Sequence, residues 1–321
     1  MKTILVTGTT GFIASHLLPL LTDYRIIAAI RNPCRSLSTA PHRTVVVGDI
    51  NGQTDWQSAL QSVEAVIHLA ARAHILQDQT SDREAAFHRI NVEGTANLAR
   101  QSLEAGVKQF ILMSSIGAVA TLSDRILSES SPCRPDTPYG RSKLAAEQGL
   151  IELCQNQSMT WTIIRPTLVY GAGNPGNMER LMNLVDRGRP LPLGAIKNRR
   201  SFVYVGNLVD AILTCLEHPQ AANQRFLISD GQDVSTPALV HLIAQQRGQN
   251  SQLLPIPPGL LRLAGKLGDT WQNLRQRPVS LNSETIDRLL GSLYVDSSYI
   301  RDRLNWHPPY TMEQGLAQTL K

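Results

Sequence analysis

The fold is decided near the start of the chain, by the stretch Val6-Thr7-Gly8-Thr9-Thr10-Gly11-Phe12-Ile13-Ala14. A β-rich run, Thr3–Thr7, leads into the two glycines, and a helical pattern follows them as far as Leu21. One glycine allows the tight turn that leaves a strand, and the next lets the backbone approach a pyrophosphate at the N-terminus of a helix. Because strand, glycines and helix come in this order, the stretch predicts a dinucleotide-binding βαβ unit.

The first half of the chain alternates strand-like and helical segments. The further β-rich runs are Arg25–Arg31, Thr44–Val47, Ala65–Ala70, Gln109–Ser114 and Thr160–Arg165, with helical patterns such as Ala85–Glu104 and Tyr139–Gln155 between them. Several runs are continuous blocks of Val, Ile and Leu, as in parallel strands that helices cover on both faces. The alternation predicts an α/β fold with a Rossmann-type, doubly wound parallel sheet.

The pattern changes after about residue 170. Glycine and proline become frequent, and the remaining elements are too short to form further βαβ units. We therefore assign residues 1–170 to the dinucleotide-binding domain, with later segments returning to it, and residues 171–321 mainly to a smaller C-terminal lobe that binds the substrate. The apolar segment Leu260–Leu267 favours a helix that packs on the lobe or on another subunit over one that lies on a membrane surface.

Composition argues against several classes of protein. Of the 321 residues, 42% are hydrophobic and 18% are charged, which fits a folded globular protein. The longest apolar runs, such as Ile26–Ile30, are far shorter than the ~18–20 residues of a membrane-spanning helix. No signal peptide is visible, so we expect a cytoplasmic protein. The four cysteines form no C-x-x-C pair, which gives no indication of a metal site. The net charge of +5 is scattered, which favours an anionic small molecule over nucleic acid as the partner.

Two charged residues bear on the choice of cofactor. The second strand ends at Arg31, where a fold that prefers NAD usually has an acidic residue for the ribose hydroxyls. An arginine suits the 2′-phosphate of NADP(H), so we expect NADP(H) to be preferred, with NAD(H) possible. Asp49 follows the third strand and is a candidate for the adenine amine. The competing interpretations are a solvated surface arginine and an aspartate in a plain turn.

The sharpest chemical signal is Tyr139-Gly140-Arg141-Ser142-Lys143, at the start of a helix. Tyrosine and lysine four residues apart lie on one face of a helix. A free tyrosine has a pKa of about 10, and a nearby ammonium favours the phenolate and pulls that pKa toward neutral pH. The pair Ser114-Ser115 stands at the end of the fifth strand and supplies a further hydroxyl. Together these residues predict an acid–base site.

Other polar residues are weaker candidates. Asn177 opens a helix and can donate to a phosphate, and Arg200 stands in a basic pair at a strand start, where it suits a diphosphate. The alternative for Arg200 is a charged surface strand. His68 lies in an apolar strand, where a structural histidine is the better interpretation. Asn91 falls inside a helix, where a packing or hydrogen-bonding role is the usual reason for an asparagine.

Taken together, these motifs resemble the extended short-chain dehydrogenase/reductase family, which contains nucleotide-sugar epimerases, dehydratases and reductases. The resemblance covers essentially the whole chain. It implies Tyr139 as catalytic acid–base, Lys143 as the residue that orients the nicotinamide ribose, and Ser115, with Ser114 as the fallback, as hydrogen-bond donor to the reacting sugar oxygen. It also implies a homodimer that pairs the helices around Ala85–Glu104 and Tyr139–Gln155.

The resemblance further implies two sets of binding residues. The cofactor-binding set is Gly8, Thr10, Gly11, Phe12, Ile13, Arg31, Asp49, Ile50, Leu69, Ala70, Ala71, Asn91, Ser114, Tyr139, Lys143 and Pro166. The set that binds a UDP-sugar is Ser115, together with the residues Asn177, Leu191, Arg200 and Arg288 of the C-terminal lobe.

A closer likeness is to a bacterial subgroup that acts on UDP-N-acetylhexosamine derivatives in O-antigen assembly. It implies reduction of the C4 ketone of a UDP-4-keto-6-deoxy-N-acetylhexosamine, which gives UDP-N-acetylquinovosamine or UDP-N-acetylfucosamine. Arg31 favours this reductase, because a reductase gains from NADPH. The alternative is an NAD-dependent UDP-hexose 4-epimerase acting on the glucose or N-acetylglucosamine derivative, and a minor one is a non-catalytic nucleotide sensor. A dehydratase is disfavoured, because Ile116-Gly117 stand where it needs an acid and a base.

Overall fold

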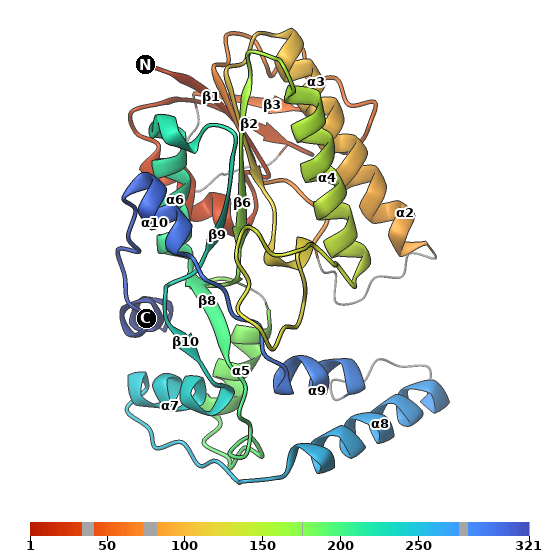
Figure 1. Ribbon diagram of the computed structural model, residues 1–321, viewed down its shortest axis with the longest axis vertical. Helices are drawn as coiled ribbons and strands as arrows, with labels where there is room; N and C mark the ends of the chain where they lie inside the picture. Colours follow the sequence, from red (N-terminus) through yellow and green to blue (C-terminus); the bar gives the residue numbers. More distant parts are fainter. Residues whose placement is uncertain (34–41, 74–81, 175, 276–281, 321) are drawn as a thin grey trace.

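The computed structural model describes residues 1–33, 42–73, 82–174, 176–275 and 282–320 (Figure 1). Its main element is a seven-stranded sheet in the order β3-β2-β1-β4-β5-β6-β9, in which all neighbouring strands are parallel. The strands are β1 (Thr3–Thr7), β2 (Arg25–Ile30), β3 (Arg43–Val46), β4 (Ala65–His68), β5 (Gln109–Met113), β6 (Thr160–Pro166) and β9 (Gln224–Ile228). The strand order reverses between β1 and β4, which is where doubly wound sheets bind their ligands. The predicted Rossmann-type architecture is confirmed.

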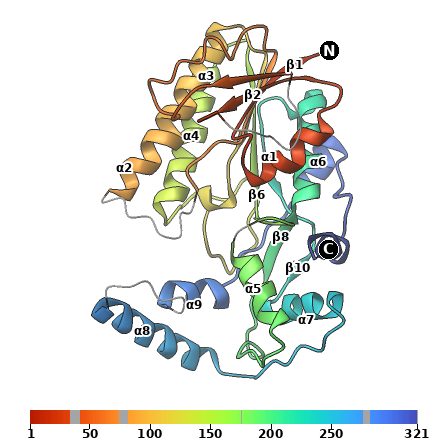
Figure 2. The same cartoon turned by 180° about the vertical axis from the view of Figure 1, so that it is seen from behind.

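Helices cover both faces of this sheet, as the apolar strands require. Along β1, Ile4 and Val6 belong to one hydrophobic cluster and Leu5 to another, because successive side chains of a strand point to opposite faces. The first cluster includes α1 (Phe12–Leu17), α6 (Val205–Glu217) and α10 (Ser298–Leu304), and the second includes α3 (Gly94–Glu104) and α4 (Pro138–Cys154). Figure 2 shows α1 and α6 together on one side, and α3 and α4 together on the other.

The helix predicted over Ala85–Glu104 is divided into three parts. It consists of α2 (Arg83–Phe87), a π-helical turn η2 (His88–Glu93) and α3. Asp82 starts α2 by accepting a hydrogen bond from the backbone N–H of Ala85. Single π turns inside helices are frequent at functional sites, and this one carries Asn91. A dimer built on the surfaces of α3 and α4 stays a prediction.

The second half of the chain contributes to both the sheet and a separate lobe. Strands β7 (Leu168–Tyr170), β8 (Arg200–Tyr204) and β10 (Asp233–Val234) form a small mixed sheet. A third hydrophobic cluster joins it to α5 (Asn177–Asp186), α7 (Thr236–Gln246) and α11 (Met312–Thr319). The chain returns to the large sheet through α6, β9 and α10, so the lobe is discontinuous in sequence. The short helices are η1 (Leu18–Leu20), η3 (Ile116–Ala118) and η4 (Pro219–Ala221).

Two further helices, α8 (Pro258–Arg275) and α9 (Ser283–Leu290), lie at the edge of the lobe (Figure 1). They pack closely, because Gly265 of α8 lets Ser283 and Ile286 of α9 approach. The opposite side of α8 exposes its large apolar side chains: Leu260, Leu263, Leu267 and Trp271 are each at least half exposed. Within the described residues, no helix combines the length and apolar character needed to cross a membrane.

Candidate active site

The turn between β1 and α1 is built around a glycine that no other residue can replace without strain. Gly8 has a φ of +69°, and a Cβ there would lie 2.7 Å from the backbone nitrogen of Ala70. The N–H of Gly11 donates to the carbonyl of Gly8 over 2.9 Å, and Gly11 starts α1 with no side chain capping its amides. Thr10 and Gly11 are exposed, and Phe12 and Ile13 are partly buried on the first turn. The residues present thus fit the pyrophosphate of a dinucleotide.

His68 links this turn to the neighbouring strand. Its Nδ1 lies 2.7 Å from Oγ1 of Thr7 and its Nε2 lies 3.0 Å from Oγ1 of Thr95. Oγ1 of Thr7 in turn accepts a hydrogen bond from the N–H of Ala70, in the predicted cofactor segment Leu69-Ala70-Ala71. Burial, with a smaller effect of the Lys143 charge, lowers the pKa of His68 to about 3. The imidazole is therefore neutral at physiological pH, and the geometry fits the structural role expected for it.

Asn91 holds the same cofactor segment from the other side. Its Oδ1 accepts from the N–H of Arg72 over 2.8 Å, and its Nδ2 donates to the carbonyl of Arg72 and to Oγ of Ser142. Asn91 is buried, and its amide is committed to these three bonds. The direct cofactor contact expected of Asn91 stays a prediction. Asn91 fixes the loop after β4 against the first turns of α4, the helix that carries Tyr139.

The predicted catalytic residues meet at the start of α4. Thr137 caps this helix by accepting from the N–H of Gly140, which places Tyr139 in its first turn. Ser115 forms a side-chain hydrogen bond with Tyr139, and its Oγ also accepts from the N–H of Gly117 over 3.0 Å. The ring of Tyr139 meets Phe87 edge-on, with the ring centroids 5.9 Å apart. These contacts single out Ser115 over Ser114 as the hydroxyl that accompanies the tyrosine.

The ionisation of these residues differs in part from the sequence-based expectation. Burial raises the pKa of Tyr139, and the hydrogen bond with Ser115 offsets this only in part. Burial lowers the pKa of Lys143 to about 8, with the carboxylate of Glu147 acting in the opposite direction. A lowering of the tyrosine pKa by Lys143 thus stays a prediction, and Lys143 itself can lose its proton in mildly alkaline solution.

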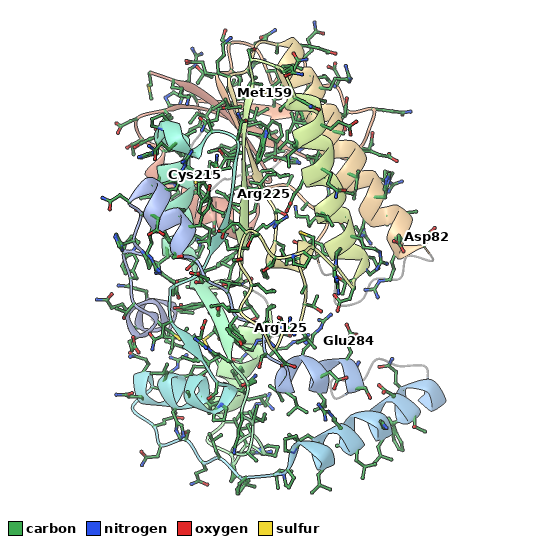
Figure 3. All side chains as sticks on the ribbon, viewed as in Figure 1. Asp82, Arg125, Met159, Cys215, Arg225 and Glu284 are labelled. Atoms are coloured by element: carbon green, nitrogen blue, oxygen red, sulfur yellow. The ribbon has the colours of Figure 1, made fainter. Side chains whose placement is uncertain are left out.

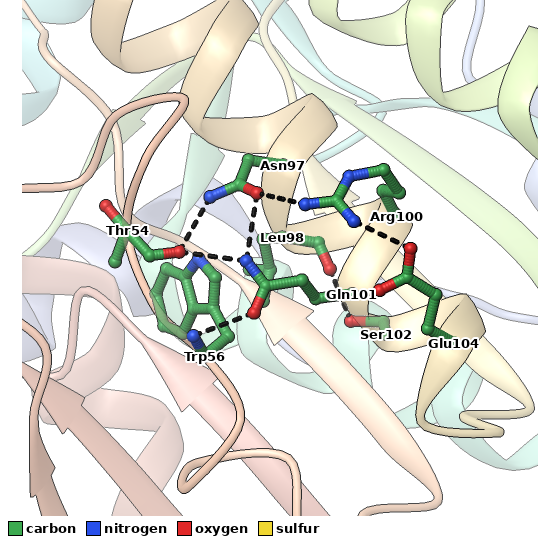
Figure 4. A network of polar contacts seen from close by, with 8 residues as sticks. All are labelled: Thr54, Trp56, Asn97, Leu98, Arg100, Gln101, Ser102 and Glu104. Carbon is green, nitrogen blue, oxygen red and sulfur yellow. Dashed lines mark hydrogen bonds and ion pairs between the residues drawn. The ribbon is translucent and has the colours of Figure 1, made fainter.

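Arg31 and Asp49 lie together at the far edge of the cofactor region. Nε of Arg31 is 3.0 Å from Oδ1 of Asp49, and both side chains are mostly exposed. Thr54 Oγ1 donates to the carbonyl of Asp49, while the carbonyl of Thr54 accepts from Asn97 and from Gln101. Figure 4 shows these side chains of α3 bonded to the loop that follows β3. Gln101 also accepts a hydrogen bond from the backbone N–H of Trp56 in this loop. Ile50 packs against Gly94 at the start of α3, where a Cβ would lie 2.6 Å from Cγ2 of Ile50.

Two of the predicted substrate residues also meet. Nη1 of Arg200 donates to the backbone carbonyls of Arg288 (2.5 Å) and Gly291 (3.2 Å). Burial and the neighbouring charge of Arg288 both lower the pKa of Arg200, so two positive charges are held close together at this point of the lobe. Arg288 itself is held by Glu284 of α9, which Figure 3 labels. Such a pair suits an anionic group.

The loop that follows Ser115 reaches this part of the lobe. The N–H of Ser123 donates to the carbonyl of Ser292, and the N–H of Leu127 to that of Tyr294. Arg125, labelled in Figure 3, lies on this loop. The strand-like segment with Ser292 pairs in turn with β8 at Arg200. The loop that begins at Ser115 and the two arginines are therefore joined through two short backbone pairings.

The remaining predicted residues lie on β6 and in the C-terminal lobe. Leu191 is buried in the hydrophobic cluster of the lobe, which is where an apolar side chain gains most, and its contact with the substrate stays a prediction. Asn177 is exposed on the first turn of α5. Pro166 is buried at the end of β6, on the same edge of the sheet as Gly8.

Comparison with known proteins identifies the family of this chain. A model of the NAD dependent epimerase/dehydratase family matches residues 4–229. The chain belongs to this family. A UDP-glucose 4-epimerase from Vibrio cholerae is 40% identical over 324 aligned positions, covering 99% of this chain and 94% of that protein. The Escherichia coli O157:H7 N-acetyl-alpha-D-glucosaminyl-diphospho-ditrans,octacis-undecaprenol 4-epimerase is 29% identical, with coverage of 99% and 94%.

A solved structure, MoeE5 in complex with UDP-glucuronic acid and NAD, has the same fold. It matches with a TM-score of 0.76 at 24% identity and covers 99% of this chain and 98% of its own. The family resemblance inferred from the motifs is confirmed.

The structure places two further residues beside the predicted catalytic group that the sequence motifs did not single out. Glu147 is buried beside Lys143, and Gly140 packs directly on Gly117. The spacing Tyr139-Lys143-Glu147 places all three on one face of α4 and could have indicated Glu147. For Gly140 no local signal exists, because its partner is 23 residues away in the chain.

Proposed function

We propose that this protein is an NAD-dependent 4-epimerase of a UDP-linked hexose, with UDP-glucose or UDP-N-acetylglucosamine as substrate. The full-length similarity to a UDP-glucose 4-epimerase carries the proposal. The site supports it, since Ser115 and Tyr139 share a hydrogen bond and Lys143 follows on the same face of α4. Ile116 and Gly117 supply no acid or base for the elimination of water, which argues against a dehydratase.

Each residue of the site has its own role in inverting the configuration at C4 of the sugar. NAD, when bound, supplies a hydride acceptor and donor. Tyr139 removes the proton of the C4 hydroxyl and later returns one to the same oxygen. Ser115 donates a hydrogen bond to that oxygen, and the ammonium of Lys143 stabilises the phenolate of Tyr139. Arg200 and Arg288 offer the positive charge for the diphosphate.

The 4-ketoreductase now has less support than the epimerase. It was favoured because Arg31 suits the 2′-phosphate of NADPH. The contact with Asp49 changes that argument, because a carboxylate 3.0 Å from the guanidinium repels a phosphate placed there. The NAD of the MoeE5 structure is consistent with this choice of cofactor.

An epimerisation assay without added reductant tests the proposal. Purified protein is incubated with UDP-glucose and with UDP-N-acetylglucosamine, with and without NAD, and the products are resolved by NMR. We expect interconversion with the corresponding galactose derivative and no net consumption of cofactor. Turnover of UDP-4-keto-6-deoxy-N-acetylglucosamine with NADPH, combined with no epimerisation, would restore the reductase.

A lipid-linked sugar diphosphate is a second candidate substrate. The exposed apolar row on α8, which ends in a tryptophan, is the kind of surface that lies in a bilayer interface. The E. coli relative is named for a substrate on undecaprenol diphosphate. The same assay with N-acetylglucosamine on a polyprenyl diphosphate in vesicles separates the two candidates, because a nucleotide-specific enzyme would leave it unchanged.

For the cofactor, we expect the protein to bind NAD more tightly than NADP. Asp49→Asn should narrow this difference by roughly tenfold, because it frees Arg31 to form a charge-assisted hydrogen bond with the 2′-phosphate. Dissociation constants of both cofactors, measured by calorimetry for the wild type and the variant, check the prediction. A wild type that already prefers NADP would show that the ion pair does not decide the choice.

For the substrate, Arg200→Ala should weaken the binding of UDP by roughly tenfold, the value of one charge-assisted hydrogen bond. Arg199→Ala is the matched control, since Arg199 is the neighbouring residue and its own mostly exposed side chain pairs with Asp233. NAD affinity should stay unchanged in both variants. If UDP binds equally well to Arg200→Ala, the arginine serves only to hold the backbone at Arg288 and Gly291.

A further inference from the structure

A buried carboxylate lies next to the catalytic residues without belonging to the predicted set. Tyr139, Lys143 and Glu147 follow one another at intervals of four on α4, so Glu147 is two turns beyond the tyrosine. Glu147 is fully buried, and its carboxylate is shared by three donors. Arg165 donates from Nε to Oε1 (3.0 Å) and Oε2 (3.2 Å) and from Nη2 to Oε2 (2.5 Å), and Ser114 donates through its hydroxyl.

These bonds join three elements at the edge of the sheet where the site lies. Ser114 stands directly after β5 and directly before Ser115, so its bond to Glu147 fixes the backbone that carries the catalytic hydroxyl. Arg165 stands near the end of β6. Glu147 therefore holds the ends of two strands against the helix that presents Tyr139 and Lys143.

The ion pair is poorly built for stability alone. Arg165 is fully buried, and besides Glu147 its described polar partner is Sγ of Cys133, 3.4 Å from Nη2. Its Nη1 is buried with no hydrogen-bond partner among the described residues. A buried pair with an unsatisfied donor can often be replaced by apolar residues without loss of stability. The position of Glu147, one helical turn beyond Lys143, indicates that its carboxylate also acts on the site.

We propose that Glu147 is a positioning residue for the epimerase site: its carboxylate holds Ser115 through Ser114 and acts on the side chain of Lys143, one turn away on α4. The role in catalysis rests on the proposed function, whereas the effect on Lys143 does not. Glu147 is the carboxylate that raises the pKa of Lys143 against the lowering by burial. Among the described residues, the other charged or titratable groups packed here include Tyr139 on α4, Arg165 from β6, Cys133 and Glu129 beside Arg165, and His68 beside Lys143.

The direct test is the titration of Lys143 in the substrate-free protein. The chain has six lysines, so NMR of protein labelled at lysine Cε gives a simple spectrum, in which Lys143→Arg identifies the Lys143 signal. The wild-type pKa should be about 8. Glu147→Gln keeps an acceptor for Ser114 and removes the charge, so the midpoint should fall by about one pH unit. Glu152→Gln, an exposed change on the same helix, should leave it unchanged.

A double variant separates this effect from simple loss of stability. Glu147→Gln leaves Arg165 buried without its counter-ion, which should lower the Tm, whereas Glu147→Gln combined with Arg165→Met removes both charges and should recover it. We expect the lowered Lys143 midpoint, and a matching shift of the alkaline limb of kcat, to persist in the double variant. A Lys143 titration that is unchanged in Glu147→Gln, or restored with the Tm in the double variant, would overturn the proposal. A wild type that does not epimerise would contradict only the proposed function, because the NMR titration needs no substrate.

Discussion

Tyr139→Phe should lower kcat for epimerisation by roughly 10²–10⁴-fold, the usual contribution of a positioned acid–base group. The phenol is the group that shares a hydrogen bond with Ser115, and phenylalanine cannot carry the proton. The ring should keep its edge-on contact with Phe87, so we expect the fold and the affinity for NAD to be retained. Steady-state kinetics with the UDP-sugar, together with a Tm, measure the effect.

Tyr24→Phe is the matched control for this substitution. It also removes a phenol hydroxyl, one that donates to Glu217 over 2.8 Å at an exposed position between η1 and β2. Its kcat should equal that of the wild type. If Tyr139→Phe turns over as fast as Tyr24→Phe, another group exchanges the proton and the assignment of Tyr139 fails.

The parts of the site that follow from local spacing were predictable from the sequence. A turn such as that at Gly8 depends on a glycine and on the strand and helix that flank it, all within a dozen residues. The Tyr139–Lys143 pair depends only on the helical repeat. The position of Ser115 followed because β5 ends just before it, at the same edge of the sheet as β1 and β4.

The parts that depend on tertiary contacts were not predictable in the same way. The sequence predicts Arg31 as a phosphate ligand because it gives no sign that Arg31 forms an ion pair with Asp49, on the loop after β3. The sequence does not show that the lobe core buries Leu191, a predicted substrate residue. Nor does it show that Ser114, a predicted cofactor residue, donates its hydroxyl to Glu147. In each case, contacts with residues distant in sequence determine what surrounds the side chain.

The choice between epimerase and reductase has the same origin. The proposed epimerase reaction and the 4-ketoreductase reaction would both use Ser115, Tyr139 and Lys143, so these residues do not distinguish the two. The argument from cofactor preference depends on the exposed edge near Arg31, where an ion pair between mostly solvent-exposed side chains is worth only about 0–1 kcal/mol. Cofactor preference is therefore open to change by single substitutions, whereas the catalytic geometry is fixed by buried contacts.

One such buried contact carries the last expected result, a loss of at least about 10²-fold in kcat for Gly140→Ala. A Cβ at Gly140 would lie 2.2 Å from the carbonyl oxygen of Gly117 and 3.1 Å from its carbonyl carbon, both backbone atoms. Helix α4 and the turn η3 must then separate, and η3 begins directly after Ser115. A displacement of about 1 Å between reacting groups can reduce the rate by that factor. Overpacking should also cost about 1–3 kcal/mol of stability.

Gly149→Ala provides the control on the same helix. A Cβ at Gly149 meets no atom within 4 Å, so the change should leave kcat unaltered and raise stability by about 0.5–1 kcal/mol through helix propensity. Both variants are compared by kcat at saturating UDP-sugar and by denaturant unfolding. A Gly140→Ala protein that is destabilised but retains full kcat would show that the contact with Gly117 serves the fold and does not set the distance between Ser115 and Tyr139.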